Sequence, residues 1–298
     1  METKEINNYK NAARVWKQAI GKASKIKEGK SLLDFANEIE KGIISESCGL
    51  AFPINLSLNE EAAHYTPNWD KTDDRSLRVS DVLKIDIGVH KDGYICDGAI
   101  TVNLDNKHAK QIEANELALE NSISVAKFGN KIDLIGKAIE DTLKEKGFNP
   151  VYNLGGHGLE QYDIHAWPSL PNHDNNSSYE LEEGAIAIEP FASTGDGFIS
   201  ESAQVDIFSL NEGKNVRNIH GRKLLAIAKT YKGLPFAERW LKTKSDLDDF
   251  QFNLGLRELM KTDVFKTYPG LKETQRHIVT QVEKSLLILE DKTIVLGE

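Results

Sequence analysis

Segments with helical hydrophobic spacing alternate along the chain with segments that have the spacing of strands. Apolar residues recur at helical intervals over residues 7–28, and Ser31 then stands where a second helix needs its N-cap. A strand is predicted over 50–58. Further along, the pattern predicts helices over 106–126 and 132–146, followed by strands over 151–159, 185–191 and 202–210. The order helix, helix, strands therefore occurs twice, although no repeat of the residues themselves accompanies it.

The clearest strand pattern forms a hairpin in the first of these halves. Residues 82–90 alternate between apolar and polar side chains, which is the period of a strand with one buried face. Residues 91–93, Lys-Asp-Gly, form a turn, because Asp-Gly accepts the positive φ of tight hairpins, and a second strand is predicted over 94–104. These antiparallel strands would bring Asp86 and Asp97 together. Two close carboxylates repel each other unless a proton or a cation lies between them.

Residues 213–265 differ from both halves because they are charged and helical. Their apolar residues form two blocks, one around Leu224 and one around Leu254. Strand-like patterns return over 278–289 and 292–296, where β-branched and aliphatic residues are frequent. We therefore expect residues 1–298 to form one domain of helices and sheet that carries a small helical insertion.

Composition narrows the class of protein. The 298 residues are 40% hydrophobic and 28% charged, which is ordinary for a soluble chain. No segment approaches the roughly 18 apolar residues of a membrane span, and the polar start of the chain is not expected to be a secretory signal. Cys48 and Cys96 are too few for a disulfide framework or a cysteine-based zinc site, so the cytoplasm is the expected compartment. The net charge of −9 disfavours a broad DNA-binding surface.

Several ionisable side chains lie in apolar strands or glycine-rich turns, where solvation does not explain them. His157 is surrounded by three glycines that leave its ring open to approach. Glu189 and Glu283 lie in apolar strand-like segments, where an unpaired buried carboxylate is costly and a cation or basic partner is expected. Each of these residues, taken singly, has a structural explanation. With the hairpin they form one set: Asp86, Asp97, His157, Glu189 and Glu283.

This set is rich in oxygen and contains a single imidazole. Its four carboxylates can neutralise two divalent cations, and bridging carboxylates suit a pair about 3.5–4 Å apart. Mn(II), Fe(II), Co(II) or Zn(II) fits such ligands, whereas a metal that prefers thiolates does not. His64 and His165 stand near the same segments and could move protons or stabilise an oxyanion, or they could be hydrogen-bonded loop histidines. An extended segment from His157 to His165 would place both rings on one face.

The segments in this order resemble the type II methionine aminopeptidases in their short archaeal form, over about residues 9 to 296. The resemblance is most specific in four segments: AAHYTP at 62–67, KIDIGVH at 84–90 with Asp97 after it, GHGLE at 156–160, and AIEPFA at 187–192. The helical insertion, with LPF at 234–236 and YPGLKE at 268–273, resembles the type II subdomain. The resemblance implies an α/β (α+β) pita-bread fold, in which a curved antiparallel sheet with pseudo-two-fold symmetry and flanking helices encloses the site.

The resemblance also implies a function. The implied function is that of a metal-dependent aminopeptidase, which removes the initiator methionine of nascent proteins when the second residue is small and uncharged. Two divalent ions (Co, Mn, Fe(II) or Zn) would be held by Asp86, Asp97, His157, Glu189 and Glu283. Asp86 and Glu283 would help to bridge or hold one metal, and Asp97 would span both. The partners implied are the N-terminal methionine of nascent chains and, near the exit tunnel, the ribosome. We expect no DNA partner and no membrane, and a monomer is the default expectation.

Catalytic roles follow from the same resemblance. A hydroxide between the metals would attack the first peptide bond, with Glu189 as the general base. His165 would stabilise the oxyanion, and His64 would contact the scissile amide and assist departure of the amine. The methionine pocket is implied to include Phe52, Ile164, His165, Phe191 and Tyr268. Two departures stand out. Lys284 occupies a position where the family often has histidine, and residues 71–78 are unusually charged for a loop near the mouth of the site.

Two other classes of protein on the same fold are alternatives. Hydrolases that cleave before proline or act on creatine usually carry an additional N-terminal domain, for which 298 residues leave no room, and they lack the insertion at 213–265. Non-catalytic members that bind RNA or protein have lost their metal ligands. The intact ligand set and the acidic balance of this chain disfavour that second alternative.

Overall fold

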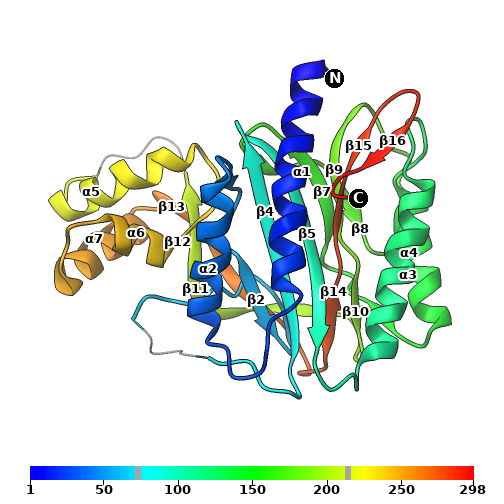
Figure 1. The fold of residues 1–298 in the computed structure, drawn as a ribbon, viewed down its shortest axis with the longest axis horizontal. Helices are drawn as coiled ribbons and strands as arrows, with labels where there is room; N and C mark the ends of the chain where they lie inside the picture. Colours follow the sequence, from blue (N-terminus) through cyan, green and yellow to red (C-terminus); the bar gives the residue numbers. More distant parts are fainter. Residues whose placement is uncertain (71–74, 212–215) are drawn as a thin grey trace.

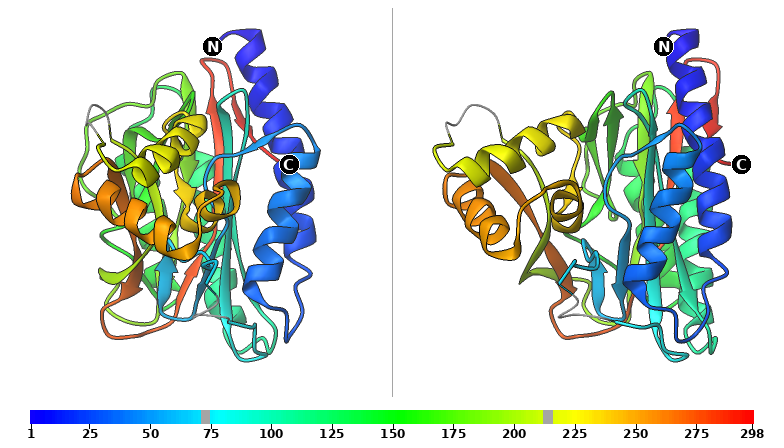
Figure 2. Two further views of the ribbon diagram at one scale, coloured as in Figure 1. Left: turned by 90° about the vertical axis from the view of Figure 1, so that its left-hand side faces the viewer. Right: turned by 60° about the vertical axis from the view of Figure 1, so that its left-hand side comes forward.

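The computed structural model describes residues 1–70, 75–211 and 216–298. Antiparallel strands form the centre of the molecule, α1 and α2 lie along one side of them, and α3 and α4 cover another part of the sheets (Figure 1). A third group of helices lies on the far side of the strands from α1, as the right-hand view of Figure 2 shows. No helix within these described ranges has the length and apolar character that crossing a membrane requires.

The first half begins with two helices, α1 (Thr3–Ala23) and α2 (Leu32–Ser45). Ser31 caps α2 as predicted, because its side chain accepts a hydrogen bond from the backbone N–H of Asp34 at 3.3 Å. The strand predicted over 50–58 is divided into two strands, because Pro53 has no N–H to donate to the hydrogen bonds of a neighbouring strand. The strands of this half are β1 (Gly49–Leu50), β2 (Asn55–Leu58), β3 (Glu61–Ala63), β4 (Val82–Lys91) and β5 (Tyr94–Asn103).

β4 and β5 form the predicted hairpin, and its turn residues Asp92 and Gly93 take positive φ values of 53° and 90°. The prediction that β4 is half-buried is wrong. Its polar residues Lys84 and Asp86 are only 1% and 7% exposed, like the apolar residues between them. The reason is that α1 packs on the hairpin while β14 from the second half also contacts it, so both faces of β4 are covered over residues 82–89.

The second half also begins with a helix pair, α3 (Ala109–Val125) and α4 (Asp133–Glu145). The predicted strand over 151–159 begins only at Gly155, and the one over 185–191 is interrupted at Pro190. The pattern does not predict β8 as a strand because it contains prolines, which the structure accommodates by placing β8 at a sheet edge. The strands are β6 (Asn149–Pro150), β7 (Gly155–Glu160), β8 (Asp163–Pro171), β9 (Gly184–Ile188) and β10 (Phe191–Ser193), with β14 (Val279–Gln281), β15 (Lys284–Ile288) and β16 (Thr293–Val295) from the end of the chain.

The helical insertion lies between two long paired strands, β11 (Ile199–Leu210) and β13 (Phe265–Glu273). Residues 213–215 of the predicted insertion lie outside the described residues. Its apolar blocks pack together with both strands in a core of their own. Its elements are α5 (Ile219–Ala228), the short 3-10 helix η1 (Lys229–Tyr231), β12 (Phe236–Ala237), α6 (Glu238–Lys244) and α7 (Asp249–Lys261). The pattern does not predict β13, whose pairing with β11 forms the base of the insertion.

A line of hydrogen bonds joins β5 of the first half to residues 281–285 of the second. Ala99 and Glu283 exchange backbone N–H···O bonds of 3.3 and 3.0 Å. On one side of them, the Ser285 hydroxyl accepts from the Asp97 N–H and donates to the Asp97 carbonyl, both at 2.8 Å. On the other side, the Thr101 hydroxyl accepts from the N–H of residue 281 at 2.9 Å and donates to its carbonyl at 2.7 Å. This seam fixes two acidic side chains from opposite halves, those of Asp97 and Glu283, beside each other.

Candidate active site

A cavity of about 340 Å³ opens between the two halves and the insertion. Of the ligand candidates, Asp86, Asp97, His157 and Glu189 line it, and Glu283 is buried beside them. The residues expected in a methionine pocket also line it: Phe52, His64, Ile164, His165, Phe191 and Tyr268. Pro235 and Ile207 line it as well, and sequence reasoning missed both. Pro235 lies in the LPF motif of the insertion, so that motif was the signal that could have identified it.

The hairpin register explains how β4 and β5 present their two aspartates. Gly88 pairs with Asp97 and Asp86 pairs with Ala99, so the two carboxylates are diagonal neighbours on one face. Gly88 is required opposite Asp97, since a Cβ there would lie 2.2 Å from the Phe52 ring. The missing side chain therefore lets Phe52 close the cavity beside the acids.

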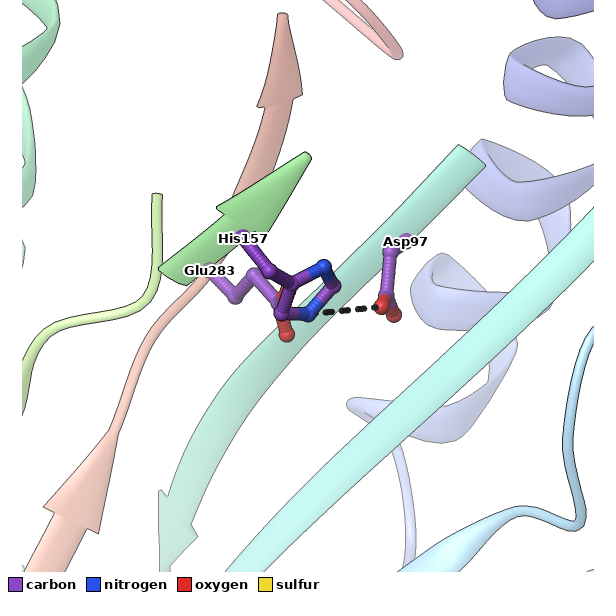
Figure 3. Close-up of side chains that lie close together, drawn as sticks. All are labelled: Asp97, His157 and Glu283. Atoms are coloured by element: carbon purple, nitrogen blue, oxygen red, sulfur yellow. Dashed lines mark ion pairs between the residues drawn. The ribbon is translucent and has the colours of Figure 1, made fainter. Parts of the chain in front are cut away.

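The candidate ligands form two groups, and ligand atoms within each group lie no more than 4.8 Å apart. One group contains Asp97, His157 and Glu283, which point toward one another from β5, β7 and the link between β14 and β15 (Figure 3). In it, His157 Nε2 is 3.8 Å from Asp97 Oδ2. The other group contains Asp86, Glu189 and Glu283. Glu283 belongs to both groups. The resemblance implies instead that Asp97 is the residue that spans both metals.

The acids of this site are held in surroundings that oppose their ionisation. Burial raises the pKa of Asp86 to about 7. Burial, and then the neighbouring Asp86 and Glu189 carboxylates, raise the pKa of Asp97 well above its usual range. The pKa values of Glu189 and Glu283 are raised in the same direction, first by burial and then by the other carboxylates. Four carboxylates in one cavity therefore need a compensating charge.

Unpaired oxygen atoms show where that charge would lie. Asp86 Oδ1, Asp97 Oδ1 and Glu283 Oε1 are buried and have no hydrogen-bond partner among the described residues. Buried polar atoms are rarely left unpaired, because their desolvation is then uncompensated. Oxygen atoms of this kind, with one imidazole, are the ligands of hard and borderline divalent metals. The residues present therefore fit divalent ions.

His157 is oriented for ligation by its own strand. Its Nδ1 lies 3.2 Å from the Gly158 carbonyl oxygen, which can only accept a hydrogen bond. Nδ1 therefore carries the proton, and Nε2 presents a lone pair toward Asp97. Burial lowers the pKa of His157 to about 4, so the ring is neutral as ligation requires.

Two further histidines and a tyrosine surround the open side of this group. The His165 ring centroid lies 4.9 Å from that of His157 and 6.0 Å from that of Tyr268, and the His64 ring lies 5.8 Å from Tyr268. The expectation of one extended segment from His157 to His165 is wrong. The chain turns at Tyr162, which takes a positive φ of 63°, and the pairing of β7 with β8 brings the rings together.

Gln281, which sequence reasoning also missed, contacts the carboxylates directly. Its Nε2 donates to Glu189 Oε1 at 2.7 Å and to Asp86 Oδ2 at 3.3 Å. A polar amide two residues before Glu283, in an apolar strand, was the available signal. Lys284 lies outside this site, because its Nζ is placed 4.9 Å from the Trp16 ring centroid, on the opposite face of the strand.

The charged segment 71–78 is described only from residue 75. Arg75 donates two hydrogen bonds to the Glu61 carboxylate, at 2.7 and 2.8 Å, and its guanidinium lies 4.1 Å over the Tyr65 ring. Tyr65 directly follows His64. Arg75 therefore secures the loop that carries this histidine.

Comparison with known proteins gives consistent results. The sequence pattern of metallopeptidase family M24 matches residues 7–217. A methionine aminopeptidase of Pyrococcus abyssi is 44% identical, with 99% of this chain and 100% of that protein covered. Methionine aminopeptidases of Archaeoglobus fulgidus and Saccharolobus solfataricus are 40% and 34% identical, with at least 93% of both partners covered in each comparison.

Solved structures show the same fold at low sequence identity. A thermophilic Arx1 gives a TM-score of 0.84 at 16% identity, with 100% of this chain and 91% of that chain covered. A methionine aminopeptidase from Thermotoga maritima gives 0.72 at 18%, with 100% and 98% covered. A prolidase from Pyrococcus furiosus gives 0.61 at 18%, with 100% and 64% covered. The predicted pita-bread fold is confirmed.

Proposed function

The chain belongs to metallopeptidase family M24, and we propose that it is a metal-dependent aminopeptidase that removes an N-terminal methionine. The observation that carries this proposal is the pair of ligand groups that share Glu283 inside a cavity with an apolar wall. Methionine aminopeptidases that match nearly the whole chain support the same activity. The whole chain acts as one catalytic unit, to which the insertion contributes Pro235.

Two divalent ions are the proposed metal content. Asp97, His157 and Glu283 would hold one, and Asp86, Glu189 and Glu283 would hold the other. Divalent ions at these positions supply Lewis acidity and make a water molecule easier to deprotonate. The identity of the ions is open among Mn, Fe(II), Co and Zn, because oxygen and imidazole ligands accept all four.

Glu189 is the proposed general base. Its carboxylate lines the cavity beside the ligand groups, and the amide of Gln281 fixes one of its oxygens. The other oxygen would serve both as a metal ligand and as the acceptor of the proton from the attacking water. A carboxylate within hydrogen-bond reach of the attacking water can take its proton as a general base.

His165 and His64 are the proposed contacts to the peptide bond that is cleaved. Desolvation in the cavity lowers the pKa of His165 to about 3, so its ring is neutral and offers one N–H to the developing oxyanion. His64 Nδ1 is 3.2 Å from the Pro269 carbonyl oxygen and donates to it. His64 Nε2 therefore presents a lone pair that can accept a hydrogen bond from the scissile amide N–H.

The proposed methionine pocket is the apolar part of the cavity. Its walls are formed by aromatic and aliphatic side chains: Phe52, Ile164, Ile207, Phe191, Pro235 and Tyr268. Such a pocket discriminates by only about 1–3 kcal/mol per methylene, so slow release of other unbranched apolar residues is expected. The acids that line the cavity beside this pocket would bind a free N-terminal amine, which would make the enzyme an exopeptidase.

A peptide panel tests the function. The chain is stripped with a chelator, Mn(II), Fe(II) or Co(II) is restored, and free amino acids are measured from Met-Ala-Ser, from its N-acetylated form and from an Ala-Pro peptide. Methionine release from the first peptide alone supports the proposal. Cleavage of the Ala-Pro peptide instead would indicate the prolidase class, and no turnover with any metal would indicate a binding protein.

The proposed setting is the cytoplasm, and the proposed substrates are nascent chains that carry a small second residue. The methionine aminopeptidases among the relatives support this choice of substrate. Contact with the ribosome is part of the proposal, and co-sedimentation of the chain with purified ribosomes tests it. A chain that stays in the supernatant at low salt would contradict that contact.

A further inference from the structure

Gln281 is placed so that one amide nitrogen serves two acids. The residue ends β14 and is 1% exposed. Its Nε2 donates at 2.7 Å to Glu189 Oε1 and at 3.3 Å to Asp86 Oδ2. Carboxylates that ligate a metal are ionised and only accept hydrogen bonds, so the nitrogen of the amide, and not its oxygen, faces them in the metal-bound site. The orientation of this side chain is therefore fixed by chemistry.

The backbone of Gln281 is held as firmly as its side chain. Its N–H donates to the Thr101 hydroxyl at 2.9 Å, and that hydroxyl donates back to the Gln281 carbonyl at 2.7 Å. On its other side, Gln281 pairs with Phe191 of β10, two residues after Glu189. The amide is thus mounted on the seam between the halves, between the strand that carries Asp97 and the segment that carries Glu189.

The hydrogen bonds of Gln281 go to two of the three acids in one ligand group, Asp86, Glu189 and Glu283. We propose that Gln281 is a positioning residue that sets the affinity of this metal position, separately from the position formed by Asp97, His157 and Glu283. The inference rests on the proposed metal set. It adds that the two positions are tuned by different residues.

The physical reason is orientation. Asp86 and Glu189 repel each other when both are ionised, and a shared N–H donor holds one oxygen of each toward a common point. Their remaining oxygens then face the cavity without a search over side-chain rotamers. Loss of a group that orients metal ligands commonly weakens metal binding by about 10–100-fold.

The experiment compares two buried glutamines. Gln281→Met keeps the length of the side chain and removes the donor. Gln111→Met is the matched control, because Gln111 is also 1% exposed and its Nε2 donates to the carbonyls of Ala192 and Ile278, at 2.8 and 3.0 Å, outside the cavity. Mn(II) is titrated calorimetrically into each chelator-stripped protein, and thermal unfolding in chelator checks that both variants are folded.

We expect one of two Mn(II) dissociation constants to rise about 10–100-fold in Gln281→Met, while the other changes less than about threefold. Both constants should stay near those of the wild type in Gln111→Met. Equal weakening of both positions, or the same change in both variants, would show a general packing effect and overturn the inference. Unchanged constants in Gln281→Met would overturn it too.

The outcome is separable from that of the proposed function. If Gln281→Met selectively loses one Mn(II) position and the wild type, with metal restored, releases no methionine from Met-Ala-Ser, the role of Gln281 is upheld and the proposed function is overturned. If the wild type releases methionine and the Mn(II) titrations of wild type and Gln281→Met are identical, the proposed function is upheld and the role of Gln281 is overturned.

Discussion

His64 Nδ1 lies 3.2 Å from the carbonyl oxygen of Pro269, and this contact determines which ring nitrogen carries the proton. A carbonyl can only accept, so Nδ1 donates and Nε2 keeps a lone pair. Burial lowers the pKa of His64 to about 4, which keeps the ring neutral near pH 7. The residue also takes a positive φ of 64°, unusual for a side chain of this size, so the backbone is strained to aim the ring.

The substitution His64→Asn distinguishes the role of Nε2 from that of Nδ1. Asparagine retains a donor near the position of Nδ1 and removes the atom at Nε2. We expect a folded protein with kcat on Met-Ala-Ser lowered about 10–100-fold, because one hydrogen bond to the scissile amide is lost. His108→Ala, outside the cavity, is the control and should keep its rate. A His64→Asn enzyme within about threefold of the wild type would contradict the assigned tautomer role.

Glu189→Gln should separate folding from catalysis. The substitution preserves shape and removes both the charge and the basicity of the side chain, so kcat should fall by about 10²–10⁴. Circular dichroism in chelator should match that of the wild type. Near-normal release of methionine would remove Glu189 from the role of general base.

The insertion is fastened to the first half by a buried ion pair. The guanidinium of Arg239 on α6 contacts the carboxylate of Glu40 on α2 and donates to the Thr66 hydroxyl at 2.5 Å. Arg239→Met leaves a buried carboxylate without its cation and should cost about 3–5 kcal/mol of unfolding free energy in urea. Adding Glu40→Met should recover much of that loss. Arg14→Met, which breaks the exposed pair with Glu46, should cost about 0–1 kcal/mol. Similar costs for the two arginines would contradict this account.

Stability without metal should depend on pH through Asp86. Its folded pKa is raised to about 7 from an ordinary value of 3.8, so the folded chain binds the proton more tightly than the unfolded chain. Its stabilising contribution is complete below about pH 4 and is lost as pH rises toward 7. Relative to Asp86→Asn, the wild type in chelator should therefore lose unfolding free energy, on the order of 1 kcal/mol per pH unit, as pH rises from about 5 to 7.

The comparison with Asp86→Asn removes groups that titrate in the opposite direction. Burial lowers the pKa of Lys84 to about 7 and that of His157 to about 4, so these groups favour the folded chain as pH rises. Both proteins carry Lys84 and His157, so the contributions of these two groups cancel. Asp97 and Glu189, whose pKa values are raised by burial and then by the Asp86 charge, add to the difference in the same direction as Asp86. A difference between the two proteins that is constant with pH would mean that Asp86 is ionised throughout.

Local patterns predicted the elements well, and the failures have physical causes. The hairpin, the N-cap at Ser31 and the order of the two halves follow from spacing and turn chemistry, which act over a few residues. The burial of Lys84 could not be predicted from these local patterns, because it depends on segments distant in sequence that cover both faces of β4. β8 was hidden by prolines that are tolerated only because the strand lies at an edge.

The residues of the site also differ in whether the sequence alone could identify them. Carboxylates in apolar strands, such as Glu189 and Glu283, are visible in sequence because burial without a partner is costly. Gln281 and Pro235 were not visible in this way. An amide and a proline in a strand or a loop have ordinary structural explanations, and only the seam and the insertion place them at the cavity.

Anomalous diffraction at the manganese edge, from crystals of chelator-stripped protein resupplied with Mn(II), tests the proposed two-metal centre most directly. We expect two peaks about 3.5–4 Å apart. One should lie within coordination distance of Asp97, His157 and Glu283, and the other of Asp86, Glu189 and Glu283. A single peak, or peaks away from Glu283, in protein that releases methionine from Met-Ala-Ser would contradict the shared-ligand centre on which the account rests.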